Sequence, residues 1–237
     1  MKCSSLDTEK LYTQATQSIL DKYGKTYTWE VKLTLMGLQN PSVFGKPYPF
    51  EVRMKMLGTT EKRSAQIAVN DLNLPISVAD YMDRYYRLCG ELLGNAALLK
   101  GAERLIRHLH EHNIPFALAT SSGSEMVDLK TTHHQELFKL FNHRVCGSSD
   151  PDVKEGKPAP DIFLVAASRF ADKPAADNCL VFEDAPNGVK AATLAGMQCV
   201  MVPDEHVPDH MCTLATQVLK SLEHFEPEHF GLPAFKA

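Results

Sequence analysis

Short apolar runs alternate with stretches of helical period along the C-terminal half of the chain. The runs at 114–120, 178–182 and 198–203 are rich in Leu, Val, Phe and Ala and are bounded by polar residues or proline, which is typical of buried strands. The stretches of helical period are 102–112, 159–170 and 186–196. Strands that alternate with helices pair in parallel through right-handed crossovers. We therefore predict an α/β fold of the Rossmann-like type, a parallel sheet with helices on both faces.

The N-terminal third has a different pattern, with helical periods at 6–23, 60–72 and 77–93 and few strand signals between them. An all-helical segment before an α/β body indicates a small separate domain. We place this helical domain at about residues 10–95 and the α/β domain at 96–237.

An internal repeat lies within the helical domain. Residues 24–37 recur as residues 45–58, with six of fourteen positions identical. Solenoid architectures need at least about three copies to bury a continuous core. Our hypothesis is that two alternative versions of one helix-and-turn element are both present in this product.

Composition narrows the class of protein. Hydrophobic residues are 44% and charged residues 23% of 237 residues, and the formal net charge is −4, which argues against general attraction to nucleic acid. No apolar run approaches the roughly 18 residues of a membrane span, and the N-terminus has no apolar stretch typical of a secretory signal. The six cysteines form no Cys-x-x-Cys pair and favour buried free thiols. We expect a cytoplasmic monomer.

The first candidate for chemistry is the run Thr120-Ser-Ser-Gly-Ser124, at the end of a predicted strand. A hydroxyl followed by small residues at a strand-to-helix turn can bind an anion through Oγ and backbone N–H groups. A simple helix N-cap is the alternative interpretation.

The second candidate is Lys157, which lies between glycine and proline in the run Gly-Lys-Pro-Ala-Pro-Asp. A lysine on a constrained loop is suited to placing one ammonium group against phosphate charge. Taken alone, a solvated loop lysine explains this run better.

The third candidate is the adjacent pair Glu183 and Asp184, which closes the run 178–182. Hard oxygen ligands of this kind suit Mg²⁺ beside a phosphate site. The alternative is that a carboxylate caps the following helix, whose N-terminus favours negative charge.

The order and spacing of the three runs carry more weight than any one of them. Together they resemble the haloacid-dehalogenase-like hydrolase superfamily, in which a hydroxyl residue ends one strand, a lysine follows, and acidic residues end the next strand. The runs Phe-Ala-Leu-Ala-Thr-Ser-Ser-Gly-Ser, Gly-Lys-Pro-x-Pro-Asp-Ile-Phe and Val-Phe-Glu-Asp-Ala-Pro-Asn-Gly-Val are similar to the pseudouridine-5′-phosphatase branch. The resemblance extends from about Leu6 to the C-terminus, apart from one repeat copy.

The resemblance implies a Mg²⁺-dependent phosphatase of small phosphorylated metabolites, such as pseudouridine 5′-phosphate or a related nucleotide or sugar phosphate. It implies that Thr120 and Lys157 are catalytic, and that Ser121 and Ser122 add substrate contacts. Asp184 would bind the metal, with Glu183 as a second ligand. The helical domain at 10–95 would be the family's cap, which closes over the substrate and excludes water.

One element of the family pattern is not found. Such enzymes attack phosphorus with the first aspartate of an Asp-x-Asp-Gly sequence, and no Asp-x-Asp-Gly occurs in this chain. We expect residues 1–9 to be a remnant of that segment, the first core strand to be missing, and this product to be an inactive isoform with weakened Mg²⁺ affinity. A non-catalytic protein that binds phosphorylated ligands or regulates partners is the alternative, and mutase chemistry on the same fold is a third reading.

Overall fold

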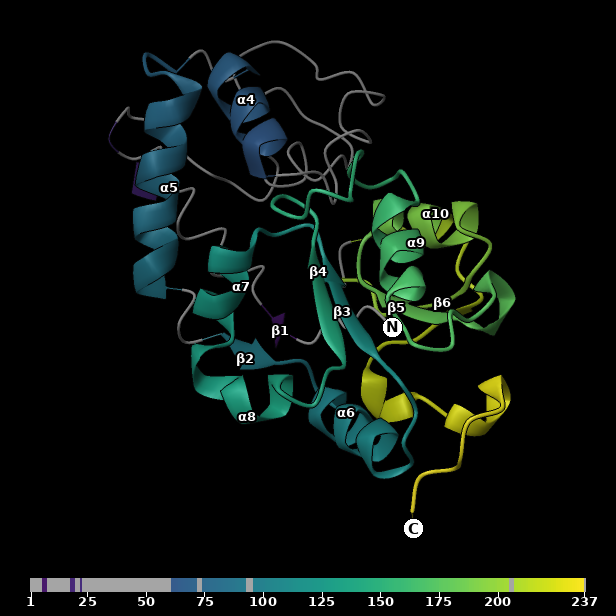
Figure 1. The fold of residues 1–237 in the computed structure, drawn as a ribbon. Helices are drawn as coiled ribbons and strands as arrows, with labels where there is room; N and C mark the ends of the chain where they lie inside the picture. The colour runs from purple at the N-terminus through teal and green to yellow at the C-terminus, as the bar shows by residue number, and fades with distance from the viewer. Residues whose placement is uncertain are drawn as a thin grey trace.

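The computed structural model describes residues 6–7, 18–19, 22, 61–71, 74–92, 96–204 and 207–236, and Figure 1 shows the arrangement of their helices and strands. The strands are β1 (Leu6–Asp7), β2 (Ala97–Leu98), β3 (Ala117–Thr120), β4 (His143–Cys146), β5 (Leu180–Glu183), β6 (Gln198–Met201) and β7 (Gln217–Val218). The α-helices are α4 (Glu61–Asp71), α5 (Val78–Leu92), α6 (Ala102–Glu111), α7 (Ser124–Lys130), α8 (Gln135–Phe138), α9 (Asp161–Ser168) and α10 (Pro186–Leu194). Short 3-10 helices occupy Thr132–His134, Ala176–Asn178, Asp209–Met211, Leu222–His224 and Pro227–Phe230.

The strands form parallel ladders, as predicted. β3 pairs with β4, from Ala117 opposite His143 to Thr120 opposite Cys146. β5, β6 and β7 form a second parallel ladder, and β1 pairs with β2 in antiparallel fashion. In the described part of the chain, no ladder joins β3 to β5. The carboxyl ends of two separate parallel ladders therefore supply the candidate residues.

Two hydrophobic clusters cover opposite faces of these ladders. Consecutive strand residues point to opposite faces, and Val181 packs in one cluster while Phe182 packs in the other. The first cluster combines β3–β6 with α9 and α10, and the second combines β5 and β6 with α6 and the C-terminal segment. Helices thus lie on both faces, which confirms the predicted α/β fold.

The helix α6 shows how the pattern specifies packing. Its predicted apolar face, Leu105, Ile106 and Leu109, is almost completely buried. On the outer side, His108 Nε2 donates to the carbonyl oxygen of Pro233 at 2.8 Å. The guanidinium of Arg104 lies 4.0 Å from the centre of the Phe235 ring. The C-terminal residues are therefore packed against α6.

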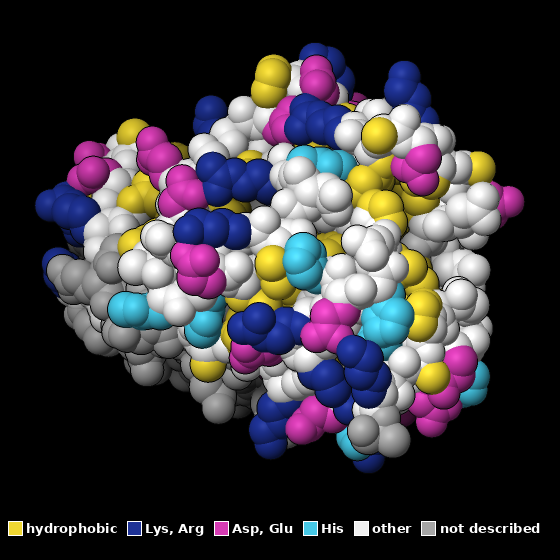
Figure 2. All heavy atoms as spheres, turned by 60° about the horizontal axis from the view of Figure 1, so that its bottom comes forward, with side chains coloured by type: hydrophobic (Ala, Val, Ile, Leu, Met, Phe, Trp, Pro, Cys, Tyr) yellow, Lys and Arg dark blue, Asp and Glu magenta, His cyan; other side chains and the backbone are white. Residues whose placement is uncertain are grey.

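Charges on the face that carries the C-terminal segment are mixed. Figure 2 shows Lys and Arg side chains interspersed with Asp and Glu side chains over this face. Lys236 pairs with Glu111 at 2.9 Å, and Arg107 pairs with Glu103 on α6 at 2.8 Å. These exposed pairs are each worth little in stability, and positive charge does not dominate the face shown.

The helices α4 and α5 confirm the helical periods predicted at 60–72 and 77–93. They pack on each other through a separate cluster that includes Ile19, Ala65 and Tyr81. In Figure 1 this pair lies away from β5 and β6. The helix predicted from residue 6 is wrong at its start, because Leu6 and Asp7 form β1 against β2. Pairing with Ala97 and Leu98 is a long-range contact that local periodicity does not encode.

Several predictions lie outside the described residues. They are the repeat at 24–37 and 45–58, and most of the segments 1–9 and 10–60. The four described cysteines are free thiols, as predicted, and burial raises the pKa of Cys146 and of Cys212. In the described residues, no helix is both long and apolar enough to cross a membrane.

Gly101, which precedes α6, allows a close backbone approach to the C-terminal segment. Its φ is +84°, and an added Cβ would lie 2.5 Å from the Glu223 amide nitrogen. We expect Gly101→Ala to lower the free energy of unfolding by the roughly 1–2 kcal/mol of a left-handed alanine, and by about 1–3 kcal/mol of overpacking in addition. Urea denaturation measures the sum of these two losses.

Gly231 provides the matched control, because its φ is +68° and no heavy atom lies within 4 Å of an added Cβ. Gly231→Ala should show the backbone cost alone. Equal losses in the two variants would contradict the close approach at Gly101.

Candidate phosphate-binding site

The candidate residues lie at the carboxyl ends of the parallel strands. Thr120 is the last residue of β3, Glu183 is the last residue of β5, and Asp184 follows directly. The carboxyl edge is where ligands bind in open α/β sheets. The structure therefore places the first and third sequence runs at the kind of edge that the pattern predicted.

Hydrogen bonds organise the loop after β3. Ser122 N donates to Thr120 Oγ1 at 3.3 Å, and Ser122 Oγ accepts from Lys130 Nζ at 2.8 Å. Ser148, beyond β4, donates from Oγ to Ser121 O at 2.6 Å. Helix α7 has Gly123 at its N-cap with no side-chain capping bond. The run therefore contains the N-cap of α7, although Gly123 supplies no side-chain capping bond, and neighbouring elements also hold the loop.

Lys157 is buried in the structure, so the solvated-loop interpretation is wrong. Its Nζ donates to Glu183 Oε1 at 2.7 Å, and the two side chains are 1% and 0% exposed. The ammonium also lies 5.1 Å from the centre of the Phe163 ring on α9. A buried charge is tolerated only when it is paired. The second and third sequence runs thus meet in one buried ion pair.

The other oxygen of Glu183 is also engaged. Oε2 accepts from the Asp184 amide at 3.2 Å, and an added Cβ on Gly188 would lie 2.0 Å from Glu183 Cδ. Helix α10 has Ala185 at its N-cap with no side-chain capping bond. Glu183 thus lies against the first turn of α10, as the helix N-terminus interpretation expects, and it pairs with Lys157 in addition. Gly188 leaves the space that the buried carboxylate occupies.

Magnesium would find oxygen donors here but no complete set among the described residues. No group of three or more His, Cys, Asp or Glu side chains converges in the described part of the chain. Asp184 and Glu183 have the hard oxygens that Mg²⁺ prefers, but both Glu183 oxygens already accept hydrogen bonds. The assignment of these two carboxylates as metal ligands stays a prediction.

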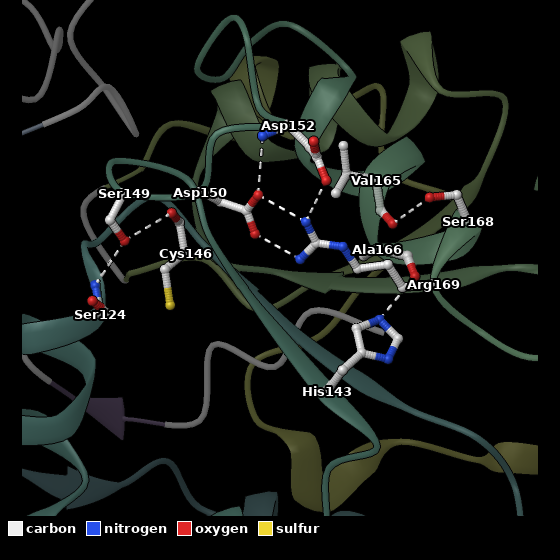
Figure 3. Close-up of polar contacts among 10 residues, drawn as sticks. All are labelled: Ser124, His143, Cys146, Ser149, Asp150, Asp152, Val165, Ala166, Ser168 and Arg169. Carbon is white, nitrogen blue, oxygen red and sulfur yellow. Dashed lines mark hydrogen bonds and ion pairs between the residues drawn. The ribbon is translucent and has the colours of Figure 1, made fainter.

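A network that the sequence did not predict lies after β4 (Figure 3). Asp150 and Asp152 both accept hydrogen bonds from Arg169, which follows α9. Hydrogen bonding from Arg169 holds the pKa of the Asp150 carboxyl below its usual value. Asp150-Pro-Asp152 is the one Asp-x-Asp in the sequence, and it is followed by valine. Both carboxylates are occupied by a structural partner.

His143 at the start of β4 lies near the same network. Its Nε2 donates to Ala166 O at 2.9 Å, and its ring packs edge-on against Phe170 with centroids 4.6 Å apart. Burial lowers the pKa of His143. No regular spacing connects His143 with Ala166 on α9, or Asp150 with Arg169 after α9, so neither contact could be predicted from the sequence pattern.

Comparisons with known proteins identify the family. The sequence model of the haloacid dehalogenase-like hydrolases matches residues 12–196. A probable pseudouridine-5′-phosphatase of Drosophila melanogaster is 53% identical over 230 residues, which are 97% of this chain and 90% of the relative. (DL)-glycerol-3-phosphatase 2 of Arabidopsis thaliana is 41% identical over 232 residues, 98% of this chain and 88% of the relative. The chain belongs to the haloacid dehalogenase-like hydrolase family.

Solved structures share the fold. CbbY from Rhodobacter sphaeroides in complex with phosphate has a TM-score of 0.67 at 21% identity, covering 93% of this chain and 91% of that one. A putative beta-phosphoglucomutase from Thermotoga maritima has a TM-score of 0.65 at 23% identity, covering 91% and 89%. The family and the α/β fold predicted from the sequence are confirmed. The missing first strand stays a prediction.

Proposed function

We propose that this chain binds the phosphate group of a small phosphorylated metabolite at the edge formed by Thr120, Lys157 and Asp184. The observation that carries the proposal is the buried ion pair of Lys157 with Glu183, at 2.7 Å, at the carboxyl end of β5. Glu183 offsets the cost of burying the Lys157 charge, and a buried charge pair at the ligand edge of a sheet marks a candidate functional site. The curated relatives named above are phosphatases.

Each residue of the proposed site would make a different contact with the phosphate group. Thr120 Oγ and the amides of the loop that follows would donate hydrogen bonds to phosphate oxygens. Ser121 and Ser122 would add contacts from the same loop. Lys157 would neutralise phosphate charge in a site of low dielectric, where one ammonium is worth more than in water. The similarity of the sequence to a probable pseudouridine-5′-phosphatase favours pseudouridine 5′-phosphate, or a related nucleotide or sugar phosphate, as ligand.

Magnesium is part of this proposal. Asp184 would hold it, with Glu183 as a second or indirect ligand, and the ion when bound would neutralise phosphate charge. No group of three or more His, Cys, Asp or Glu side chains converges among the described residues, so we expect weak Mg²⁺ binding. Helices α4 and α5, within residues 10–95, would form a cap over the edge, and we propose a cytoplasmic monomer.

Binding with little turnover is the second part of the proposal. Covalent phosphoryl transfer in this family starts from an Asp-x-Asp-Gly, which the sequence lacks. The one Asp-x-Asp present is held by Arg169. This observation favours a non-catalytic phospholigand-binding protein over an active phosphatase for the chain as given.

Isothermal titration with inorganic phosphate and with pseudouridine 5′-phosphate, with and without Mg²⁺, tests the proposal. We expect binding by the unmodified protein, and about tenfold or more weaker binding by Lys157→Met, because a charge-assisted hydrogen bond is lost. Thr120→Val, which keeps the shape of the side chain, should also weaken binding. p-Nitrophenyl phosphate should not be turned over.

Lys154→Met is the matched control, because Lys154 is on the same loop but its Nζ bonds the Pro151 carbonyl in an exposed position. Its affinity should equal that of the unmodified protein. Absence of phosphate binding by the folded protein would refute the binding proposal. Hydrolysis at a rate normal for the family would refute the second part alone.

A further inference from the structure

We propose that Arg169 is a positioning residue for Lys157, an inference that rests on the phosphate-binding role proposed above. Arg169 does not touch the ion pair of Lys157 and Glu183. It acts on the loop that carries Lys157 from the end of β4 to the start of α9. Nothing in the sequence pattern or in the family comparison assigns this arginine a role.

The contact is a three-point clamp (Figure 3). Arg169 Nη1 donates to Asp150 Oδ2 at 2.6 Å, and Nη2 donates to Asp150 Oδ1 and to Asp152 Oδ2, both at 2.8 Å. The Asp152 amide closes the turn by donating to Asp150 Oδ1 at 3.1 Å. The Asp150 side chain is only 10% exposed. A bidentate pair with this burial fixes geometry better than an exposed ion pair does.

A second anchor holds the same loop from the opposite end of α9. Asp161 Oδ2, on the first residue of the helix, accepts from the amides of Lys154 at 3.1 Å and Glu155 at 3.0 Å. The two anchors span the loop from Asp150 to Glu155. Both anchors hold this stretch of backbone against α9.

Lys157 lies two residues after Glu155, and its side chain contacts the same helix. Its Nζ lies over the Phe163 ring of α9 while donating to Glu183 on β5. The helix itself is fixed to β4 where His143 Nε2 donates to Ala166 O. The direction of the ammonium therefore depends on a loop that is held against α9, and Arg169 holds the end of that loop nearest β4.

Lysine is a poor substitute at position 169. The guanidinium presents a rigid planar fork that matches a carboxylate with two parallel bonds, whereas an ammonium is a point charge on a flexible stem. Arg169→Lys should keep the charge and lose the fork. It therefore separates positioning from simple charge pairing.

The test is a graded series, with Arg169→Gln removing three bonds, Asp150→Asn weakening two and Asp152→Asn weakening one. Hydrogen–deuterium exchange of residues 150–157 should quicken in that order, while β3 and β5 keep their protection. Affinity for inorganic phosphate should fall in the same order, by about tenfold in Arg169→Gln, the size of effect typical of supporting residues around a site. Arg169→Lys should lie between Arg169→Gln and the unmodified protein.

Arg144→Gln is the matched control, because Arg144 on β4 also pairs with an aspartate, Asp128, but not on this loop. It should change neither measurement. Where the unmodified protein binds phosphate and Lys157→Met binds it more weakly, the inference is overturned if Arg169→Gln leaves phosphate affinity unchanged, whether or not loop exchange quickens. If Arg169→Gln fails to fold, Asp152→Asn, which keeps the bidentate pair, decides the question.

Failure of the proposed function gives a different result. In that case Lys157→Met binds phosphate as well as the unmodified protein does, or neither protein binds it. Exchange of residues 150–157 then decides the inference, because it reports the clamp without any ligand. Unchanged exchange in Arg169→Gln would overturn it.

Discussion

Replacing Lys157 with methionine is expected to lower the free energy of unfolding by about 3–5 kcal/mol, because removal of one partner leaves a buried, unpaired charge on the other. Glu183 is fully buried, and Lys157 Nζ is its cationic partner at 2.7 Å. The total stability of a domain is about 5–15 kcal/mol. The loss should be evident in urea denaturation monitored by circular dichroism.

A double-mutant cycle separates this charge effect from lost packing. Glu183→Gln alone leaves the Lys157 ammonium without its counter-charge and should also destabilise. The double variant Lys157→Met with Glu183→Gln removes both charges, and it should be less destabilised than the sum of the single variants. Strict additivity of the two losses would show that the ion pair carries no coupling energy.

Gly188→Ala is expected to cost about 1–3 kcal/mol or more, because the new methyl group overpacks a rigid site. The added Cβ would lie 2.0 Å from Glu183 Cδ and 2.2 Å from both carboxylate oxygens. Alanine otherwise favours a helix over glycine by about 1 kcal/mol. A destabilised variant would therefore reverse the sign that helix propensity predicts. Phosphate affinity should fall in parallel, since Glu183 must move and Lys157 moves with it.

Gly123→Ala is the control for this substitution. An added Cβ there meets nothing closer than 3.9 Å, and its φ is −72°. Gly123 is the N-cap of α7, where alanine is less favourable than glycine, so the variant's free energy of unfolding should fall by about 1 kcal/mol or less, without an overpacking cost. If Gly188→Ala is as stable as Gly123→Ala, Glu183 is not confined as described.

Much of the fold was predictable because apolar runs and helix boundaries are local signals. β5, β6 and α10 follow directly from uninterrupted apolar runs and from proline at the helix start. β4 was not predicted, because His143 and Arg144 are polar and only Val145 and Cys146 follow. Pairing with β3, rather than the pattern of its own four residues, makes β4 a strand. β1 was mistaken for the start of a helix, because its pairing with β2 is a long-range contact that its own residues do not encode.

The candidate site was predictable in its members but not in its contacts. Thr120, Lys157, Glu183 and Asp184 were selected by order and residue type. That Lys157 and Glu183, 26 residues apart, form one buried pair is a property of the packed structure. The clamp of Arg169 on Asp150 joins residues 19 apart with no periodic relation. Charged residues that pair over such distances resemble solvated surface residues in a sequence.

The buried ion pair helps to hold the two separate parallel ladders together. Lys157 belongs to the connection that follows β4, and Glu183 belongs to β5, while no ladder joins β3 to β5 among the described residues. Among the described residues, the pair therefore spans a seam between the two parallel ladders, which side chains of the first hydrophobic cluster also bridge. A phosphate that contacts both Thr120 and the edge of β5 would fasten the same seam. Phosphate binding should then raise the free energy of unfolding, by about 2.7 kcal/mol at a ligand concentration of about 100 Kd.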